Sequence, residues 1–311
     1  MGGGMKTAVI TGSAGQDGSY LAALLTAEGY RVIGINRDNP PVRLTDSAAL
    51  SRFLAHEQPH EIYHLAAVHH AAEDRLTDDW ELFTESQAVH TVATACLLEG
   101  CRRHCPAARL FFAASCHLFG TPTTPVQDET TPFRPDGIYA ITKQAGVELC
   151  RYYRRRHGVF AAVGILFNHE SPRRPSRFVS RKIVEAAVAI WQGRQTTLVL
   201  GDLDAEVDWG FAGDYVSAMR AILNLDQPDD FVIASGEPHT VREFVEQAFG
   251  LLGLDWQRHV RVEPALLRGP ARPGWRGDAS KLRRATGWRP TTTFAELVRL
   301  MVQAERERVG A

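Results

Sequence analysis

Two hydrophobic periodicities alternate along the first half of the chain. Short apolar runs, typical of buried strands, are separated by longer stretches in which apolar positions recur every three or four residues, as on a helix with one buried face. The runs that predict strands are 6–12, 31–37, 61–68, 108–115 and 160–168. The stretches that predict helices are 19–30, 47–58, 85–104 and 139–158.

Strands that alternate with helices predict a parallel sheet with helices on both of its faces. The pattern becomes less regular after about residue 170, where Pro and Arg accumulate in 170–177 and 268–277. We therefore expect an α/β fold with a Rossmann-type, doubly wound parallel sheet and a smaller C-terminal lobe. Residues 5–168 should form the cofactor-binding domain. Residues 169–311 should form mainly a substrate-binding lobe, interleaved with returning strands of the sheet.

Composition excludes several classes of protein. The 311 residues are 44% apolar and 23% charged, with a net charge of −1, so no basic surface for nucleic acid is expected. No apolar run is long enough to span a membrane, and the N-terminal segment does not read as a signal peptide. The five cysteines form no disulfide framework, which favours the reducing cytoplasm. Cys101 and Cys105 lack the paired spacing of a zinc site, so no metal is expected.

A glycine-rich turn joins the first predicted strand to the first predicted helix. Gly12, Gly15 and Gly18 form a G-x-x-G-x-x-G pattern, with Ala14, Gln16 and Asp17 between them. In this position glycines allow a tight turn, and the helix N-terminus can meet the pyrophosphate of a dinucleotide.

Arg37 ends the second predicted strand. An acidic residue there binds the ribose of NAD, whereas Arg accommodates the 2′-phosphate of NADP. The pattern therefore favours NADP over NAD, with a solvated surface Arg as the alternative.

Tyr139 and Lys143 form a Y-x-x-x-K pair after the strand that ends at Ser115. Residues four apart share one face of a helix, and a Lys charge there favours the phenolate form of Tyr. Such a Tyr can exchange a proton with a sugar hydroxyl while hydride moves to a nicotinamide, and Ser115 would hydrogen bond the same hydroxyl. The alternative is a Tyr half-buried against the sheet for structural reasons.

These motifs, and longer segments, resemble those of extended short-chain dehydrogenases/reductases, and most closely the GDP-mannose 4,6-dehydratases. The similar segments cover nearly the whole chain and include 11–22, 61–70, 165–183, 200–219 and 277–305. The resemblance implies a GDP-sugar substrate and an NADP that is reduced and reoxidised within one turnover. It also implies a homodimer or homotetramer.

The resemblance also gives roles to further residues. In addition to the glycine-rich turn, Arg37, Tyr139 and Lys143, it places at the cofactor Leu65, Ala66, Ala67, His69, Trp80, His169 and Arg174. Trp80 stands where the family usually has Tyr. The residues that it places at the nucleotide-sugar are Asn168, Lys182 and Arg268.

The end of the catalytic strand departs from the family. Its members have Ser/Thr-Ser-Glu, in which Glu removes the C5 proton of the sugar, whereas this chain has Ser115, Cys116 and His117. His117 can serve as a base or acid, because the ordinary pKa of His lies near neutrality. Cys116 could donate a proton or attack an unsaturated intermediate. The structural alternatives are a small buried apolar Cys and a hydrogen-bonded His at a strand end.

Other departures fall near the expected substrate. The segment between Arg37 and Leu44 is shorter than in the dehydratases by roughly a helix and most of a strand. Arg43, Val207 and His90 replace family residues of different chemistry, and the 268–274 block lacks a family Glu. Trp275 lies in this Pro-rich region, where we expect it either to close over the nucleotide base or to belong to a surface loop.

The sequence therefore predicts a nucleotide-sugar 4,6-dehydratase whose catalytic residues are Ser115, Cys116, His117, Tyr139 and Lys143. Two alternatives remain open. One is an NADPH-dependent 4-keto-6-deoxy-sugar reductase or epimerase, which needs no dehydratase Glu. The other is a catalytically silent, nucleotide-binding homologue.

Overall fold

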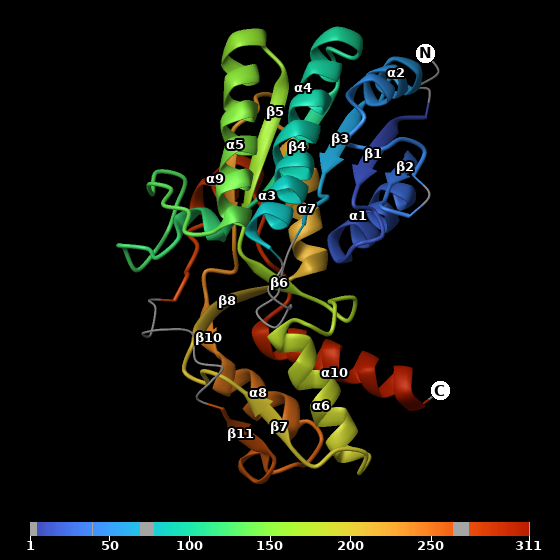
Figure 1. Cartoon of the computed structure of the whole chain (residues 1–311). Coiled ribbons are helices and arrows are strands. Elements are labelled where there is room, and N and C mark those ends of the chain that lie inside the picture. The colour runs from blue at the N-terminus through green and yellow to red at the C-terminus, as the bar shows by residue number, and fades with distance from the viewer. Residues whose placement is uncertain (1–4, 39, 69–77, 264–273, 311) are drawn as a thin grey trace.

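Parallel strands form the main sheet, in the order β2-β1-β3-β4-β5-β9 (Figure 1). The computed structural model describes residues 5–38, 40–68, 78–263 and 274–310. The strands of this sheet are β1 (Thr7–Thr11), β2 (Arg31–Ile35), β3 (Glu61–His64), β4 (Arg109–Ser115), β5 (Phe160–Leu166) and β9 (Asp230–Ile233). Except in the edge strand β2, whose central residues are half-buried, their central residues are buried, as expected for a parallel sheet that is covered on both faces.

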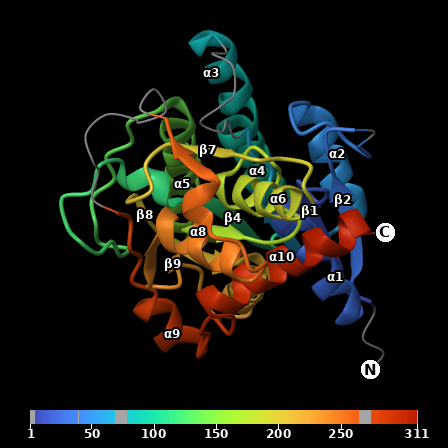
Figure 2. The ribbon, with the colours of Figure 1, turned by 90° about the horizontal axis from the view of Figure 1, so that it is seen from below.

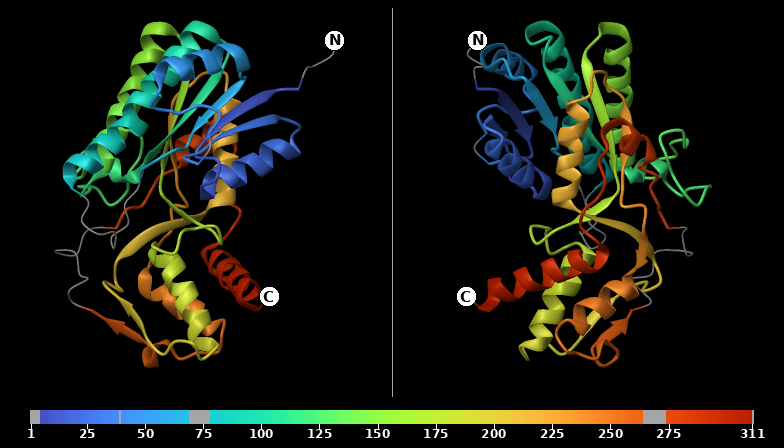
Figure 3. Two further views of the ribbon diagram at one scale, coloured as in Figure 1. Left: turned by 45° about the vertical axis from the view of Figure 1, so that its right-hand side comes forward. Right: turned by 180° about the vertical axis from the view of Figure 1, so that it is seen from behind.

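Two layers of helices cover the sheet (Figure 3). One apolar core lies between the sheet and the helices α2 (Ser47–Glu57), α4 (Ala93–His104) and α5 (Ile138–His157). A second core lies on the opposite face, under α1 (Gln16–Ala27), α7 (Ala212–Leu223) and α9 (Ser280–Thr286). The predicted α/β class with a doubly wound parallel sheet is confirmed.

A smaller lobe lies below the carboxyl ends of the strands (Figures 1 and 2). Its core is formed by α6 (Val179–Trp191), α8 (Val241–Gly250), α10 (Phe294–Gly310) and the parallel pair β7 (Leu198–Leu200) and β11 (Val260–Val262). The sheet that leads into this lobe consists of β6 (Asn168–Glu170), β8 (Glu206–Phe211) and β10 (Pro238–Thr240). No helix in the described part of the chain is long and apolar enough to cross a membrane.

The predicted helix 85–104 is interrupted. It comprises α3 (Asp79–Gln87), a π-helical turn (Ala88–Val92) and α4. Because the Ala93 amide donates to the Ala88 carbonyl, the intervening Val89 carbonyl is left for another donor, and it accepts a hydrogen bond from His64 Nε2 at 3.1 Å. The apolar pattern continues through such a turn, so it did not reveal the interruption.

The strand ends define where a ligand can approach. His64, the last residue of β3, pairs with Phe112 of β4. Beyond this pair, β4 continues for three more residues and ends at Ser115, which pairs with Leu166 of β5. Gly146 lets α5 approach this part of β4, because a Cβ there would collide with the Phe112 ring. The polar residues of α5 are thereby brought to the carboxyl edge of the sheet, where α/β proteins bind ligands.

Asp208 of β8 joins three segments that are distant in the sequence. Its buried carboxylate accepts hydrogen bonds from the Ser235 amide at 2.9 Å, the Ser235 hydroxyl at 2.6 Å, the Gly236 amide at 3.0 Å and the Gly277 amide at 3.0 Å. Burial raises the pKa of Asp208, and these four donors act against that rise. The carboxylate thus holds the small lobe, the end of β9 and the 274–278 segment together.

Asp208→Ala should lower the free energy of unfolding by about 3 kcal/mol, because it leaves buried amide donors without an acceptor. Chemical denaturation followed by circular dichroism measures this change. The control is Asp204→Ala, because the Asp204 side chain is 77% exposed and its ion pair with Arg242 lies at the surface. That change should stay within about 0.5 kcal/mol, and equal losses for the two variants would contradict the role of Asp208.

Candidate active site

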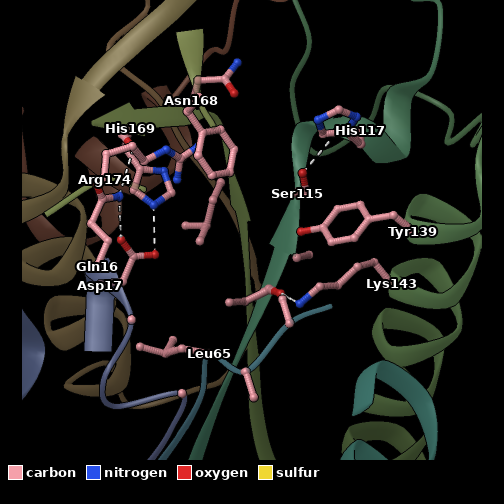
Figure 4. Close-up of a pocket in the computed structure, with 18 of the residues that line it drawn as sticks. Gln16, Asp17, Leu65, Ser115, His117, Tyr139, Lys143, Asn168, His169 and Arg174 are labelled. Atoms are coloured by element: carbon pink, nitrogen blue, oxygen red, sulfur yellow. Dashed lines mark hydrogen bonds and ion pairs between the residues drawn. The ribbon is translucent and has the colours of Figure 1, made fainter. Parts of the chain in front are cut away.

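A cavity of about 280 Å³ opens at the carboxyl edge of the main sheet (Figure 4). Small side chains at the ends of β3 and β4 leave this space free, and the wall there consists of Ala66, Ala67, Ala113 and Ala114. Gln16, Asp17, His169 and Arg174 lie on one side of the cavity, and Ser115, His117, Tyr139 and Lys143 lie on the other. The cavity therefore has one side formed by a helix N-terminus and an opposite side that carries the residues predicted from the sequence to be catalytic.

The glycine-rich turn has the geometry of an anion-binding loop. Gly12 has a φ of +73°, and a Cβ at Gly18 would collide with the Gly12 carbonyl. Gly15 caps α1 without any side-chain hydrogen bond, so amides of the first helical turn have no protein acceptor from a cap. Such a helix end, with glycines that allow close approach, fits a pyrophosphate.

Asn36, which follows β2, holds this turn and was not singled out from the sequence. Its side-chain oxygen accepts from the Ala14 amide at 2.7 Å and from the Ser13 hydroxyl at 2.9 Å. Ala14 is thereby placed on the rim of the cavity. Arg37, which follows Asn36 in the sequence, is exposed. Neither Ala14 nor Arg37 is among the residues that line the cavity.

Most of the predicted site residues come together at the cavity. Those that line it are Gly12, Gly15, Gln16, Asp17, Gly18, Leu65, Ala66, Ala67, Ser115, Cys116, His117, Tyr139, Lys143, Asn168, His169 and Arg174. Trp80 is not among them, since its side chain is 70% exposed and packs on Phe83. Lys182 lies half-buried on α6, also outside the lining. His69 and Arg268 fall outside the described residues.

Ser115, Tyr139 and Lys143 face one another across a gap between β4 and α5 (Figure 4). Lys143 is buried and its ammonium group donates to the Ala113 carbonyl at 2.7 Å. Burial lowers the pKa of Lys143 to about 7. Burial also raises the pKa of Tyr139, although its hydrogen bond with Ser115 acts in the opposite direction. The expected lowering of the Tyr139 pKa is thus outweighed by desolvation in this structure.

Cys116 belongs to the apolar core under α5 although it also borders the cavity. Its side chain is 1% exposed, and burial raises the pKa of the thiol to about 12. The nearby charge of Asp208 adds to this rise. Because nucleophilic attack requires the thiolate, these surroundings favour an unreactive thiol.

His117 lies in a short 3₁₀ turn (Cys116–Phe119) that begins after Ser115, and its amide donates to the Ser115 hydroxyl oxygen at 3.3 Å. Burial lowers the pKa of the imidazole, and the charge of Asp136 acts against this shift. The ring is therefore neutral at neutral pH, in the form that can accept a proton.

The contact between Trp275 and His117 was not foreseen from the sequence. Its ring centroid lies 4.7 Å from that of His117, and its Nε1 donates to the Gly120 carbonyl at 2.9 Å. The sequence placed Trp275 over the nucleotide base or in a surface loop, because nothing local relates it to the end of β4.

An ion pair crosses the opposite side of the cavity. His169 Nε2 lies 2.8 Å from the Asp17 carboxylate, and His169 Nδ1 lies 2.7 Å from the Phe167 carbonyl. Since both partners are acceptors, the imidazole donates from both nitrogens and is charged. Burial alone would lower the pKa of His169, but the charge and hydrogen bond of Asp17 raise it overall. Burial alone would raise the pKa of Asp17, but the charge and hydrogen bond of His169 lower it overall.

Two other buried histidines lie behind the residues that line the cavity and are not among them. His64 Nδ1 accepts from the Thr11 hydroxyl at 2.7 Å, and burial lowers the pKa of His64 to about 3. His90, in the π-helical turn, accepts from the Val68 amide at 3.0 Å and contacts Thr142 at 2.9 Å. These bonds fix the chain after β3 against α5. In the described part of the chain, no group of three or more His, Cys, Asp or Glu could hold a metal ion.

Comparison with known families identifies the family of the chain. Residues 9–42 and 40–301 match the family model of GDP-mannose 4,6 dehydratase. The chain belongs to the GDP-mannose 4,6-dehydratase family. GDP-mannose 4,6 dehydratase 2 of Arabidopsis thaliana is 40% identical, over 98% of this chain and 89% of its own length. The GDP-mannose 4,6 dehydratase of Cricetulus griseus is 37% identical, over 97% of this chain and 92% of its own length.

Solved structures confirm the fold. RMD from Pseudomonas aeruginosa, complexed with NADPH, matches with a TM-score of 0.83 at 22% identity, over 98% of this chain and 100% of that chain. The match to the dehydratase family model breaks between residues 40 and 42. That break lies in the segment between Arg37 and Leu44, which the sequence predicts to be shorter than in the dehydratases. This segment follows β2, an edge strand of the main sheet.

Asp17→Asn should move the pKa of His169 from above 6.5 to below it, because burial then acts without the opposing carboxylate. The wild-type pair stabilises the fold between pH 3.8 and 6.5. Its contribution is lost as the pH falls through the lowered pKa of Asp17 or rises through the raised pKa of His169. Titration of labelled histidines by NMR measures the change, with Asp204→Asn as the control. An unchanged His169 pKa in Asp17→Asn would exclude the ion pair.

Proposed function

We propose that this chain is an NADP-dependent GDP-sugar 4,6-dehydratase, a lyase that removes water across C5 and C6 of the sugar. Family membership supports the reaction class. The observation that carries the proposal is the neutral imidazole of His117 beside the Ser115–Tyr139 pair, in the same cavity as the glycine-rich turn. This position is the one at which the family resemblance places the Glu that removes the C5 proton.

The residues present fit NADP. The uncapped N-terminus of α1 suits the pyrophosphate, and the turn from Gly12 to Gly18 packs so tightly that a Cβ at Gly18 would collide with its backbone. Arg37, exposed beside this turn, is available for the 2′-phosphate. When bound, the cofactor supplies the acceptor and later donor of hydride, and its oxidised ring adds a positive charge that favours the Tyr139 phenolate.

Tyr139 takes the proton of the C4 hydroxyl, which Ser115 orients by hydrogen bonding. Lys143 stands one helical turn from Tyr139, and its cation lies 5.9 Å from the centroid of the Tyr139 ring. Because burial lowers the Lys143 pKa to about 7, its charge responds to its partners in the site. These three residues thereby take up the proton of the C4 hydroxyl. Because the sugar keeps its ketone at C4 after water is lost, this proton is then available for C5 when the double bond between C5 and C6 is saturated.

His117 then acts on the neighbouring carbon. A ketone at C4 acidifies the C5 hydrogen, and the neutral imidazole accepts it as a proton. The imidazolium returns a proton to the C6 hydroxyl, which leaves as water, so the charges balance within one residue. The buried Cys116 thiol, with its pKa raised to about 12, contributes packing and no thiolate. One histidine thus replaces both the base and the acid expected from the family pattern.

Turnover of GDP-mannose and related GDP-sugars in D₂O, followed by mass spectrometry and NMR, tests the reaction. Loss of one water from the sugar supports the dehydratase. Deuterium at C5 or C3 without loss of water identifies an epimerase. Consumption of a 4-keto sugar only with added NADPH identifies a reductase. Tight nucleotide binding without turnover identifies a silent homologue.

His117→Ala should lower the rate of water loss by roughly 10² to 10⁴, as expected for a lost general base. His117→Glu should retain water loss, because a carboxylate can take the same proton. The control is Cys116→Ala, which should keep the wild-type rate within a few-fold and lose about 1 kcal/mol of stability. Rates compared by product NMR decide the matter, and a fully active His117→Ala contradicts the assignment.

Three further expectations, on assembly, location and partners, accompany this function. We expect a homodimer or homotetramer in the cytoplasm, without a nucleic-acid or membrane partner. Light scattering on the purified full chain measures the oligomeric state.

A further inference from the structure

The 274–278 segment is anchored on both sides where it passes the end of β4. On one side, Gln127 pairs with it through the Gln127 amide and the Arg276 carbonyl at 2.8 Å, and through the Asp278 amide and the Gln127 carbonyl at 2.9 Å. On the other side, Trp275 forms a parallel bridge with Val207. The segment therefore behaves as a short strand clamped between two neighbours.

Further contacts fix its position along that strand. The Gly277 amide donates to the Asp208 carboxylate at 3.0 Å, and the Arg276 guanidinium donates to the Gly236 carbonyl at 3.0 Å. Gly274 packs so closely on β8 that a Cβ there would lie 2.6 Å from the Cβ of Glu206. With its backbone held in this way, Trp275 has little freedom to move away from His117.

The indole of Trp275 is held at both ends. Its Nε1 donates to the Gly120 carbonyl, just after the turn that carries His117. The planes of the Trp275 and His117 rings meet at 65°, with their centroids 4.7 Å apart. Tyr139 contacts the imidazole in a T-shaped arrangement, with centroids 5.8 Å apart and planes at 80°. His117 is thus held between an aromatic residue of α5 and one from the C-terminal part of the chain.

Trp275 and Tyr139 contribute no charge to the surroundings of His117. In the described part of the chain, the titratable groups near it include the Tyr139 hydroxyl on α5, Asp136 in the segment before α5, and, against the adjacent Cys116, Asp208 on β8. Asp136 favours the protonated ring, so the opposing, larger effect is the removal of water by the surrounding side chains. The indole is the largest of those in ring contact with the imidazole.

We propose that Trp275 is a positioning residue for His117: its indole holds the imidazole at the sugar end of the cavity and shields it from water. The backbone bridge between Trp275 and Val207 fixes the indole in this position. The neutral imidazole depends on this shielding, and its aim toward the sugar depends on the clamped 274–278 segment. This inference rests on the proposed function for its catalytic consequence, whereas the contact itself can be tested without any turnover.

The experiment uses the full chain and three variants. Trp275→Leu removes the aromatic ring, Trp275→Phe keeps a ring but removes the Nε1 donor, and Trp191→Leu serves as a matched control on the surface of α6, where Trp191 is 45% exposed. Histidine-labelled protein is titrated by NMR, with the His117 signal identified from its loss in His117→Gln. Circular dichroism confirms that each variant is folded.

In Trp275→Leu, the pKa of His117 should rise toward the ordinary value of 6.5, because water regains access to the ring. In Trp275→Phe the rise should be smaller, and in Trp191→Leu it should be absent. An unchanged His117 pKa in a folded Trp275→Leu overturns the proposal.

Kinetics with GDP-mannose give the second measurement. A base must be neutral to act, so activity is lost as the pH falls through its pKa, and this acid limb of kcat should move to higher pH in Trp275→Leu. Above the limb, kcat should fall about 10- to 100-fold through misplacement of the ring, with KM changed no more than about threefold. If KM rises in Trp275→Leu while kcat and its acid limb stay unchanged, the proposal is also overturned.

The two measurements separate the failure of this inference from that of the function. If the His117 pKa rises as expected but wild-type protein removes water from no GDP-sugar, the contact stands and the dehydratase assignment is wrong. If wild-type protein is a dehydratase and His117→Ala is inactive, but Trp275→Leu matches wild type in both measurements, the positioning role is wrong.

Discussion

A single buried carboxylate connects the parts of this protein that must meet for chemistry. Asp208 accepts four hydrogen bonds from the turn after β9 and from the 274–278 segment, and it stands on the strand that leads into the small lobe. Burying a carboxylate costs free energy unless such donors surround it, so the segments are held by the need to satisfy it. The position of Trp275, and through it that of His117, depends on this arrangement.

The two sides of the cavity differ in charge for physical reasons. On the side of β4 and α5, burial acts against charge: it lowers the pKa of Lys143 and His117 and raises that of Tyr139 and Cys116. On the other side, Asp17 and His169 remain charged because each compensates the other's burial. Groups whose charged form is disfavoured by burial therefore face a side of the cavity that is held charged by the Asp17–His169 pair, next to the glycine-rich turn.

The departures from the family pattern make sense together in this structure. In the proposed mechanism, His117 replaces the anionic base expected from the family by a neutral one, and the exclusion of water keeps its imidazole neutral. The aromatic contact with Trp275, beside Val207 rather than an arginine, supplies an apolar environment at that point. Cys116, which looked reactive beside His117, turns inward and belongs to the core.

The sequence by itself determined the α/β class, the glycine-rich turn, the helical spacing of Tyr139 and Lys143, and the family. These features are local: each depends on periodicity or on residues within a few positions of one another. The tertiary structure decided which groups become partners. Gly120 meets Trp275 across 155 residues, Asp17 meets His169 across 152, and the carbonyl released by the π-helical turn meets His64. It also decided protonation, since burial depends on packing from distant segments that no local pattern reveals.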